Sequence, residues 1–366
     1  MKLTAQRKDV AEALHIVGRG VSGRSTLPIL SNVLLEVGKK RLRLLATDLE
    51  MWVECGIDVE AAEDGSVTVP ARVLGELVDR FGEGPVAMEL AAEGSPLTVT
   101  SGKAQYEIQC LPAQEFPAAP QVIDGSTIKM AQGDLRRLIR SVIFAASGDE
   151  TRAVLTGAML RCEGDGVMLV ATDMHRLAVN GGAASVTGEP AQAVIPSRAL
   201  NEVARAATGE GEVVISLGEG QIRFEVGDVC VVSRLVEGQF PDYKRVIPEQ
   251  PQQQLVVNRE ELLTAIRRAA VLARAEANKV VLRAQEGVLS IRAESADVGR
   301  GSEQVAVQLE GGEIEIAFNA EYLIDVLSVL EAESVEIGLT GPLSPGIVRP
   351  TDGAQFIYVV MPMAIL

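Results

Sequence analysis

Side chains that could do acid–base or metal chemistry are scarce in this sequence, which has only two histidines, His15 and His175. His175 follows Asp173 by two residues, so spacing alone permits a Ser-His-Asp site, but the sequence places no nucleophile beside the pair. There is no phosphate-binding loop, nucleophile elbow or zinc-protease motif. An enzyme acting through Asp173 and His175 is therefore the weaker interpretation. We expect no catalytic residue, no cofactor and no metal.

The four cysteines lie far apart and form no C-x-x-C pair: Cys55, Cys110, Cys162 and Cys230. This spacing argues against a disulfide framework or a zinc site and favours a reduced setting. No apolar run reaches the ~18 residues of a membrane span. The first residues also lack the apolar core of a signal peptide. We therefore expect a cytoplasmic protein without a membrane segment.

Length and charge leave the class of partner open. A chain of 366 residues allows two or three domains, and 47% hydrophobic residues are enough for buried cores. The net charge of −16 argues at first against a nucleic-acid partner, because such proteins usually carry a basic face. The total, however, does not say where the charges lie. With only 3% aromatic residues, base stacking on single strands has little support.

An internal repeat organises the chain. Three segments carry apolar residues at i, i+3, i+4 and i+7, which is the pattern of one helix face. They are Val10, Ala13, Leu14 and Val17; Leu135, Leu138, Ile139 and Val142; and Leu262, Ala265, Ile266 and Ala269. An acidic residue precedes each set, and Asp9, Asp134 and Glu261 are spaced by 125 and 127 residues. Such a period is the mark of a repeated structural unit. In the third copy, Asn258 together with Glu261 predicts a capped helix start.

A second helix repeats with the same period. The segments that begin at Pro70, Pro196 and Asn319 align with one another, and each follows a short β-like run. Two junctions, 111–117 and 235–241, share an L-x4-F-P frame. These features predict domains 1–124, 125–250 and 251–366. We expect an α+β fold in which each domain has two helices on about eight short strands of antiparallel sheet.

Tight turns should join the strands of each repeat. Residues 33–37 should turn through Gly38-Lys39 into 42–46, and 159–162 should turn through 163–166 into 167–171. The triplet Ala-Thr-Asp recurs at Asp48 and Asp173. An aspartate that bonds the backbone of its own turn explains this recurrence better than a catalytic aspartate does.

Positive charge is concentrated on the predicted helices. The net charge is +2 for residues 134–146, +1 for 197–207, +2 for 258–274, zero for 7–17 and for 71–81, and −4 for 320–333. We expect the helices to share a face toward a polyanion, because arginine attracts phosphate without reading sequence. Arg136, Arg137, Arg198 and Arg205 are candidates for that contact. Ordinary solvation of the helices by arginine explains the same charges equally well.

Five segments carry a family resemblance: 26–30 (TLPIL), 46–51 (ATDLEM), 171–179 (ATDMHRLAV), 240–243 (FPDY) and 358–363 (YVVMPM). In order and spacing they resemble the beta subunit of bacterial DNA polymerase III, the replicative sliding clamp, along the whole chain. The resemblance implies a DNA clamp fold of three repeated domains and a head-to-tail dimeric ring with helices lining the pore. It implies a clamp that encircles duplex DNA and gives polymerase processivity, without catalysis of its own.

The resemblance also implies roles for single residues. Positions that contact DNA in the family match Arg24, Arg72 and Arg198. Tyr106 and Ile108, on an expected strand 106–110, would meet Val271 and Leu272 of a second chain in the homodimer. Plain core packing is the alternative for Tyr106 and Ile108.

A pocket for short peptides is the third implied site. Through it the family binds the polymerase III alpha subunit, the clamp loader, other DNA polymerases and repair proteins. The matching residues are Leu155, Thr172, Met174, His175, Arg176, Leu177, Pro241, Arg245, Val246, Asn319, Tyr322, Leu343, Val359, Val360, Met361, Pro362 and Met363. A methionine-rich rim suits varied partners, because thioethers repack around different ligands.

Several positions depart from the family pattern. Met174 stands where a glycine is common and would narrow the pocket, and Ala277 falls near a position that is often aromatic. Ala153 and Val154 replace tyrosines that contact DNA in some members. The end of the sequence, 364–366, lacks the final basic residue of some members. A monomeric peptide-binding scaffold that does not bind DNA is the remaining alternative.

Overall fold

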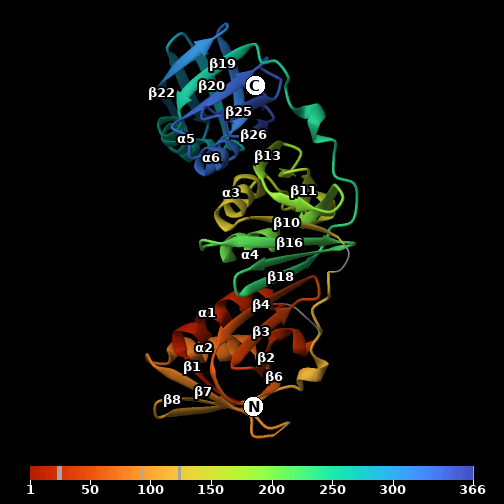
Figure 1. Cartoon of the computed structure of the whole chain (residues 1–366). Helices are drawn as coiled ribbons and strands as arrows, with labels where there is room; N and C mark the ends of the chain where they lie inside the picture. Colours follow the sequence, from red (N-terminus) through yellow and green to blue (C-terminus); the bar gives the residue numbers. More distant parts are fainter. Residues whose placement is uncertain (23–26, 93, 123–124, 366) are drawn as a thin grey trace. The chain divides into compact units, whose positions relative to one another are not determined.

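The computed structural model describes residues 1–22, 27–92, 94–122 and 125–365 (Figure 1). This part of the chain divides into two compact units. Unit 1 consists of Met1–Arg136, Ser185–Glu189 and Arg198–Leu235. Unit 2 consists of Arg137–Ala184, Pro190–Ser197 and Val236–Leu366. The second sequence repeat therefore contributes to both units. The predicted boundaries at 124 and 250 divide the chain by repeat, and they stay a prediction.

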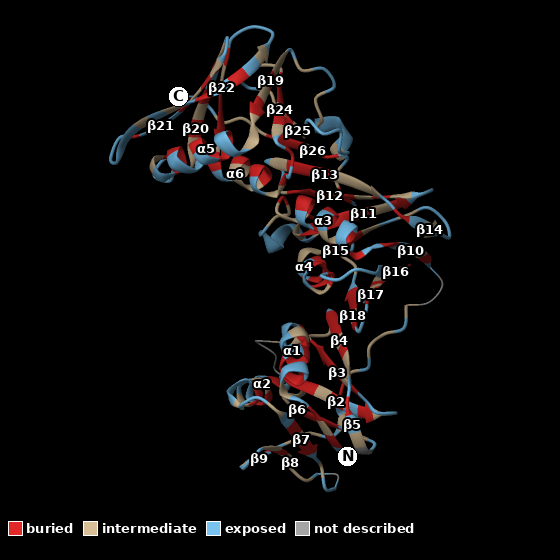
Figure 2. Cartoon of the chain, turned by 60° about the vertical axis from the view of Figure 1, so that its left-hand side comes forward, coloured by how far each residue is buried: buried red, intermediate tan, exposed pale blue. Residues whose placement is uncertain are grey.

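The helices confirm the predicted repeat. They are α1 (Arg7–Val17), α2 (Ala71–Arg80), α3 (Gln132–Ile143), α4 (Ser197–Ala206), α5 (Arg259–Ala273) and α6 (Ala320–Val329). All twelve apolar residues that predicted the first helix of each repeat are buried, which Figure 2 shows as red on the inner helix faces. Asn258 caps α5 as expected, since its side chain accepts from the N–H groups of Glu260 at 3.0 Å and Glu261 at 3.1 Å. No helix of the described residues is long and apolar enough to cross a membrane.

Two predicted helices end three or more residues earlier than expected. α3 ends at Ile143 rather than 146, because the N–H groups of Ala145 and Ala146 bond back only three residues. α6 ends at Val329 rather than 333, because Leu330 adopts an extended backbone. Hydrophobic spacing could not locate either end, since terminal turns are set by local backbone geometry.

Unit 1 contains two antiparallel sheets. The nine-stranded sheet has the order β14-β10-β16-β17-β18-β4-β3-β2-β6, and the five-stranded sheet has the order β5-β1-β7-β8-β9. The strands are β1 (Lys2–Gln6), β2 (Asn32–Gly38), β3 (Arg41–Thr47), β4 (Met51–Asp58), β5 (Glu60–Glu63), β6 (Gly65–Pro70), β7 (Pro85–Glu89), β8 (Leu97–Ser101), β9 (Ala104–Ile108), β10 (Ser126–Ala131), β14 (Ser185–Thr187), β16 (Glu212–Gly218), β17 (Gln221–Val226) and β18 (Val229–Arg234). Helix α1 packs on β3, β4 and α2.

Unit 2 contains one twelve-stranded sheet of order β15-β11-β12-β13-β26-β25-β24-β19-β22-β21-β20-β23. Its strands are β11 (Gly157–Glu163), β12 (Gly166–Thr172), β13 (Arg176–Ala183), β15 (Ala191–Pro196), β19 (Gln253–Asn258), β20 (Lys279–Gln285), β21 (Val288–Ser295), β22 (Gly299–Glu310), β23 (Ile314–Asn319), β24 (Ser334–Leu339), β25 (Gly346–Pro350) and β26 (Ile357–Val360). Helix α5 packs on α6 and on β20, β21 and β22 (Figure 1). The alternating burial of β20 and β21 places their apolar side chains under this helix layer.

Neighbouring repeats are joined by strand pairing, and we call each such junction a seam. At the first seam β4 pairs antiparallel with β18, with Val53 opposite Val231. At the second seam β13 pairs antiparallel with β26, with Leu177 opposite Val359. The first seam lies within unit 1 and the second within unit 2. β4 and β13 begin at Met51 and Arg176, one repeat apart, so both seams use the same strand of the preceding repeat.

The Ala-Thr-Asp turns confirm the structural interpretation of their aspartates. Asp48 Oδ1 accepts from the N–H groups of Glu50 at 3.1 Å and Met51 at 2.8 Å. Asp173 Oδ1 does the same for His175 at 2.9 Å and Arg176 at 3.0 Å. Each aspartate thus closes the turn that leads into the seam strand.

Two predicted details of the strands are wrong. The hairpin after β2 turns through Lys39 and Lys40, which adopt φ of +53° and +62°, while Gly38 remains in the strand opposite Arg41. Pairing of buried Val37 with Leu42 fixes this register. The strand expected at 106–110 is β9, which ends at Ile108, because the backbone of Leu111 pairs with Thr68 instead.

We expect the thiols of Cys55 and Cys230, which lie on β4 and β18, to resist alkylation at pH 8. Burial raises the pKa of each to about 11, so both remain protonated there, and only the thiolate reacts. Iodoacetamide labelling followed by peptide mass spectrometry should show slow modification that accelerates as the pH approaches 11. Protein unfolded in urea is the control. Labelling of native and unfolded protein at equal rates at pH 8 would contradict this prediction.

Candidate functional site

A small, largely apolar pocket of about 80 Å³ lies beside the second seam, within unit 2. Its lining comes from the turn before β13, from the short helix η5 (Tyr243–Val246) and the residues just before it, and from β26 and its end. The lining residues are Thr172, Met174, His175, Arg176, Leu177, Pro241, Asp242, Tyr243, Val246, Val359 and Met361. A concave apolar site with a few polar groups is the usual form of a ligand pocket.

The junction segment that precedes η5 is held in place by side chains that pack in the core. Phe240 is buried in a cluster with Met159, Val170 and Val194. The hydroxyl of Tyr243 lies 3.2 Å from the sulfur of Met168. The L-x4-F-P frame therefore supplies a core anchor, and the residues after it form one wall of the pocket.

The two seams differ in what fills this position. Trp52 and Leu177 correspond, since each stands four residues after the turn aspartate of its repeat. At the first seam Trp52 packs against Leu45, Phe116 and Val232. At the second seam the smaller Leu177 occupies the corresponding position. Its smaller side chain accounts for the pocket beside it.

Arg176 organises the polar side of the pocket. Its Nε donates to Asp173 Oδ2 at 3.0 Å, and its Nη1 donates to Asp325 Oδ2 on α6 at 2.5 Å. The guanidinium also lies 4.4 Å from the ring centre of Tyr322. Only 11% of this side chain is exposed. Its two acids belong to the second and third repeats, so Arg176 ties these repeats together.

Burial and charge shift the pKa values of this network. Burial lowers the pKa of Arg176, but hydrogen bonding to Asp325 and the charge of Asp173 outweigh it and leave the pKa raised. Burial raises the pKa of Tyr358, whose hydroxyl donates to the carbonyl of Tyr322 at 2.9 Å. Burial likewise raises the pKa of Tyr322. The arginine is therefore charged and both tyrosines are neutral across the physiological range.

The pocket residues predicted from the resemblance divide into two groups. Nine of them line the cavity: Thr172, Met174, His175, Arg176, Leu177, Pro241, Val246, Val359 and Met361. The others do not line it: Leu155, Arg245, Asn319, Tyr322, Leu343, Val360, Pro362 and Met363. Of these, Tyr322 supports Arg176, whereas Leu155 and Val360 are buried and Leu343 is exposed. Asp242 and Tyr243 line the cavity and were missed, although they lie in the quoted motif at 240–243.

Met174 occupies a backbone conformation that favours glycine, with φ of +77°. Leu49, its counterpart in the first repeat, adopts φ of +76°. The side chain of Met174 is half exposed and lines the pocket, and the narrowing of this site by Met174 stays a prediction. His175 meets Asp173 through its backbone N–H rather than its ring, so the pair has no catalytic arrangement.

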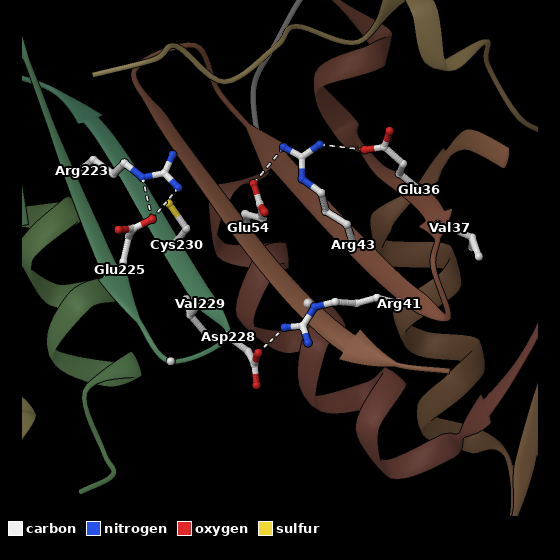
Figure 3. A pocket seen from close by; sticks show the side chains of 13 residues that line it. Glu36, Val37, Arg41, Arg43, Glu54, Arg223, Glu225, Asp228, Val229 and Cys230 are labelled. Atoms are coloured by element: carbon white, nitrogen blue, oxygen red, sulfur yellow. Dashed lines mark hydrogen bonds and ion pairs between the residues drawn. The ribbon is translucent and has the colours of Figure 1, made fainter. Parts of the chain in front are cut away.

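A second hollow, of about 460 Å³, lies on the sheet face at the first seam (Figure 3). Arg41 pairs with Asp228 across the seam. Arg43 pairs with Glu36 and Glu54, each at 2.8 Å. Figure 3 also shows Arg223 on Glu225, at 2.8 Å. Each guanidinium is thus paired with a carboxylate. The ion pairs of Arg41 and Arg43 connect β3 to neighbouring segments, whereas the pair of Arg223 lies within β17.

The arginines predicted to contact DNA lie on helices, except Arg24, which falls outside the described residues. Arg72, on α2, is largely exposed and lies 3.6 Å from Glu76. On α3, Arg136 is partly buried and Arg137 is exposed. On α4, Arg198 pairs with Asp48 and Arg205 with Glu202, and both side chains remain half exposed.

The residues predicted for the dimer interface are partly exposed. Tyr106 on β9 is half exposed and its ring lies 6.0 Å from that of Phe81. Ile108 is buried, which agrees with core packing. On α5, Val271 is well exposed and Leu272 is partly exposed.

Three families of known domains match this chain. Residues 1–120 match the N-terminal domain, 129–242 the central domain and 244–364 the C-terminal domain of the DNA polymerase III beta subunit. The chain is 36% identical to the beta sliding clamp of Pseudomonas aeruginosa and 34% identical to that of Escherichia coli, covering 99% of this chain and 100% of each relative.

Solved structures agree with these sequence matches. The DNA polymerase III subunit beta of Pseudomonas aeruginosa superposes with a TM-score of 0.93 at 36% identity, over 100% of both chains. The DNA polymerase sliding clamp of Bacillus subtilis gives a TM-score of 0.94 at 29% identity, again over 100% of both chains. A clamp from Pseudomonas aeruginosa bound to griselimycin gives 0.95 at 36% identity, over 100% of both.

Repeated helices, seams built from one pair of strands and domain matches along the whole length lead to one conclusion. The chain belongs to the family of the DNA polymerase III beta subunit, the bacterial sliding clamps, and acts as a processivity factor rather than as an enzyme.

Proposed function

We propose that two copies of this cytoplasmic protein close head to tail into a ring around duplex DNA, and that each copy holds partner proteins by short peptides in the pocket beside the second seam. The observation that supports the ring is that the same seam occurs twice in the chain. Each seam pairs one strand of a repeat with one strand of the next repeat. The first and the last repeat each have one matching strand that has no such partner among the described residues. These two strands would pair with each other between chains and form a third seam.

β9 is one of the two open strands. It follows β8 after a two-residue turn, as β18 follows β17, so Tyr106 corresponds to Val231. Val231 is buried at the first seam, opposite Val53. β9 stands at the edge of its sheet, and 49% of Tyr106 is exposed. An exposed aromatic on a sheet edge is the feature that pairing with another strand would bury.

The first half of β22 is the other open strand. It follows β21 as β4 follows β3 and β13 follows β12. Gly299–Ala306 pairs with β21 on one side, and among the described residues it has no strand partner on the other. Val298, just before it, is 59% exposed, and Val271 on the neighbouring α5 is exposed as well. A partner chain's β9 would cover these apolar groups.

Such a head-to-tail contact is heterologous, and it closes only if the rotation per chain suits a ring. Three similar domains in each of two chains give six similar domains, and so a near-sixfold ring. The basic helices would then face the DNA, which arginine attracts weakly and without reading sequence. Weak attraction suits a protein that moves along the duplex.

The pocket would serve the partners expected from the family: the polymerase III alpha subunit, the clamp loader, other DNA polymerases and repair proteins. Its apolar lining of Leu177, Pro241, Val246 and Val359 fits a short aliphatic side chain. The flexible thioethers of Met174 and Met361 would adapt to different peptides. Griselimycin bound to a relative that is 36% identical supports a ligand-binding role for this clamp family.

Replacement of Tyr106 by glutamate should convert the dimer into a monomer of 38.8 kDa, because an unpaired carboxylate would be buried at the interface. Light scattering at micromolar concentration would measure the mass. Val73→Glu, at an equally exposed residue on α2, is the matched control and should stay dimeric. A wild-type protein that is monomeric at this concentration would argue against the ring and for a monomeric scaffold.

Loaded clamp should remain on a circular duplex and be lost when the circle is cut. The reason is topological, since a ring that encircles DNA without tight contacts can leave only at an end. Gel filtration of labelled clamp with nicked circular DNA, before and after linearisation, would measure retention. Equal retention on both forms would point to ordinary surface binding.

Val246→Glu should weaken griselimycin binding at least about tenfold, because a charge would enter the apolar pocket. Isothermal titration of the purified dimer would measure the affinity, and Val73→Glu should bind as the wild type does. Unchanged binding by Val246→Glu would place the ligand elsewhere.

A further inference from the structure

We infer that Arg19 is a further phosphate-contacting residue, held with Arg198 and Arg205 in one arginine cluster whose internal counter-ions are Glu202 and Asp48. This inference rests on the proposed encirclement of DNA and adds to it a residue and a mechanism of charge control. All five residues belong to unit 1, at the first seam. We call them the seam arginine cluster.

Glu202 lies at the centre of the cluster. Its side chain is only 9% exposed, although it stands on the surface helix α4. Arg19 Nη1 lies 3.4 Å from Glu202 Oε2, and Arg205 Nη1 donates to Glu202 Oε1 at 2.5 Å. One buried carboxylate therefore holds two guanidinium groups, one from each of two repeats. A buried acid is retained in a fold when it is paired in this way.

Arg198 joins the cluster from the first turn of α4. Its Nη1 donates to Asp48, the aspartate that closes the first Ala-Thr-Asp turn. Its Nη2 donates to the backbone carbonyl of Arg19 at 2.7 Å. Arg19 itself lies in the short helix η1 (Gly18–Gly20), directly after α1. The backbone contact fixes Arg198 and Arg19 relative to each other.

The three guanidinium groups are exposed to solvent, whereas the carboxylates that pair with them are mostly buried. Arg19, Arg198 and Arg205 are 41%, 50% and 55% exposed, whereas Asp48 and Glu202 are mostly buried. A guanidinium has five N–H donors, so each can bond a phosphate without leaving its carboxylate. Three positive charges against two negative ones leave one net positive charge on a fixed array. That is the weak, sequence-neutral attraction a sliding protein needs.

Two other groups of charged residues in the chain differ from the seam arginine cluster. At the second seam, the corresponding acids Asp173 and Asp325 both bind Arg176, which is nearly buried and turned toward the peptide pocket. On the sheet face of the first seam, the hollow in Figure 3 holds three arginines among four acidic residues. Among these three groups, only the seam arginine cluster combines exposed arginines, covered acids and a positive balance.

The test is a salt titration of the full-length dimer on a short fluorescent duplex, followed by anisotropy. Arg19→Ala should make the slope of log K against log salt shallower by roughly one, as Arg198→Ala should, because one phosphate contact is lost. Arg161→Ala is the matched control, since Arg161 is a half-exposed arginine paired with Glu163 on β11. Its slope should equal that of the wild type.

The outcomes distinguish a failure of the role of Arg19 from a failure of the proposed encirclement of DNA. A wild-type slope for Arg19→Ala, with a shallower slope for Arg198→Ala, would overturn the inference and leave the proposed function intact. No salt-dependent duplex binding by the wild type would overturn both. Arg19→Lys should restore most of the slope, because a lysine still supplies one positive charge.

The counter-ion role has its own test. Glu202→Gln and Asp48→Asn each remove one negative charge, so both should bind the duplex several-fold more tightly at low salt. Circular dichroism melting would check that each variant is folded, and either folded variant suffices. Unchanged or weaker binding by the folded variants would overturn the assignment of these acids as counter-ions.

Discussion

Antiparallel strand pairing between repeats is the interaction on which the rest of this molecule depends. The second and third repeats each end in a strand that completes the sheet of the preceding repeat, as β18 does for β4 and β26 does for β13. Backbone hydrogen bonds do not depend on which side chains the strands carry. The same seam can therefore occur twice with different residues around it. The fold determines the strand pairing at each seam, and the surrounding side chains can differ.

That divergence makes the two seams chemically different. The first seam is filled by Trp52 and flanked by arginines that stay open to solvent. The second seam carries the smaller Leu177, an enclosed Arg176 and a cavity. One joint is thereby suited to a polyanion and the other to an apolar peptide. Both differences arise at matching positions of one repeated fold.

The sequence predicted the repeats, the helices and the Ala-Thr-Asp turns, because hydrophobic spacing and short-range backbone bonding are local properties. It did not predict the hairpin at Lys39 and Lys40, where register overrides turn preference. The pairs Arg176–Asp325 and Arg19–Glu202 also escaped it, since their members are 149 and 183 residues apart. The pocket residues came largely from resemblance, and the structure added Asp242 and Tyr243 through their place before and in η5.

The open edges of β9 and β22 would be the weakest contact of the proposed ring. Seams within the chain are held at high effective concentration, because the polypeptide keeps their strands together even when the hydrogen bonds break. The proposed seam between chains would have no such tether, so dilution or a competing protein would act on it first. If that joint closed at the wrong angle, the same heterologous contact would add chain after chain and produce filaments. The rotation from one chain to the next would therefore decide between a closed ring and an open filament.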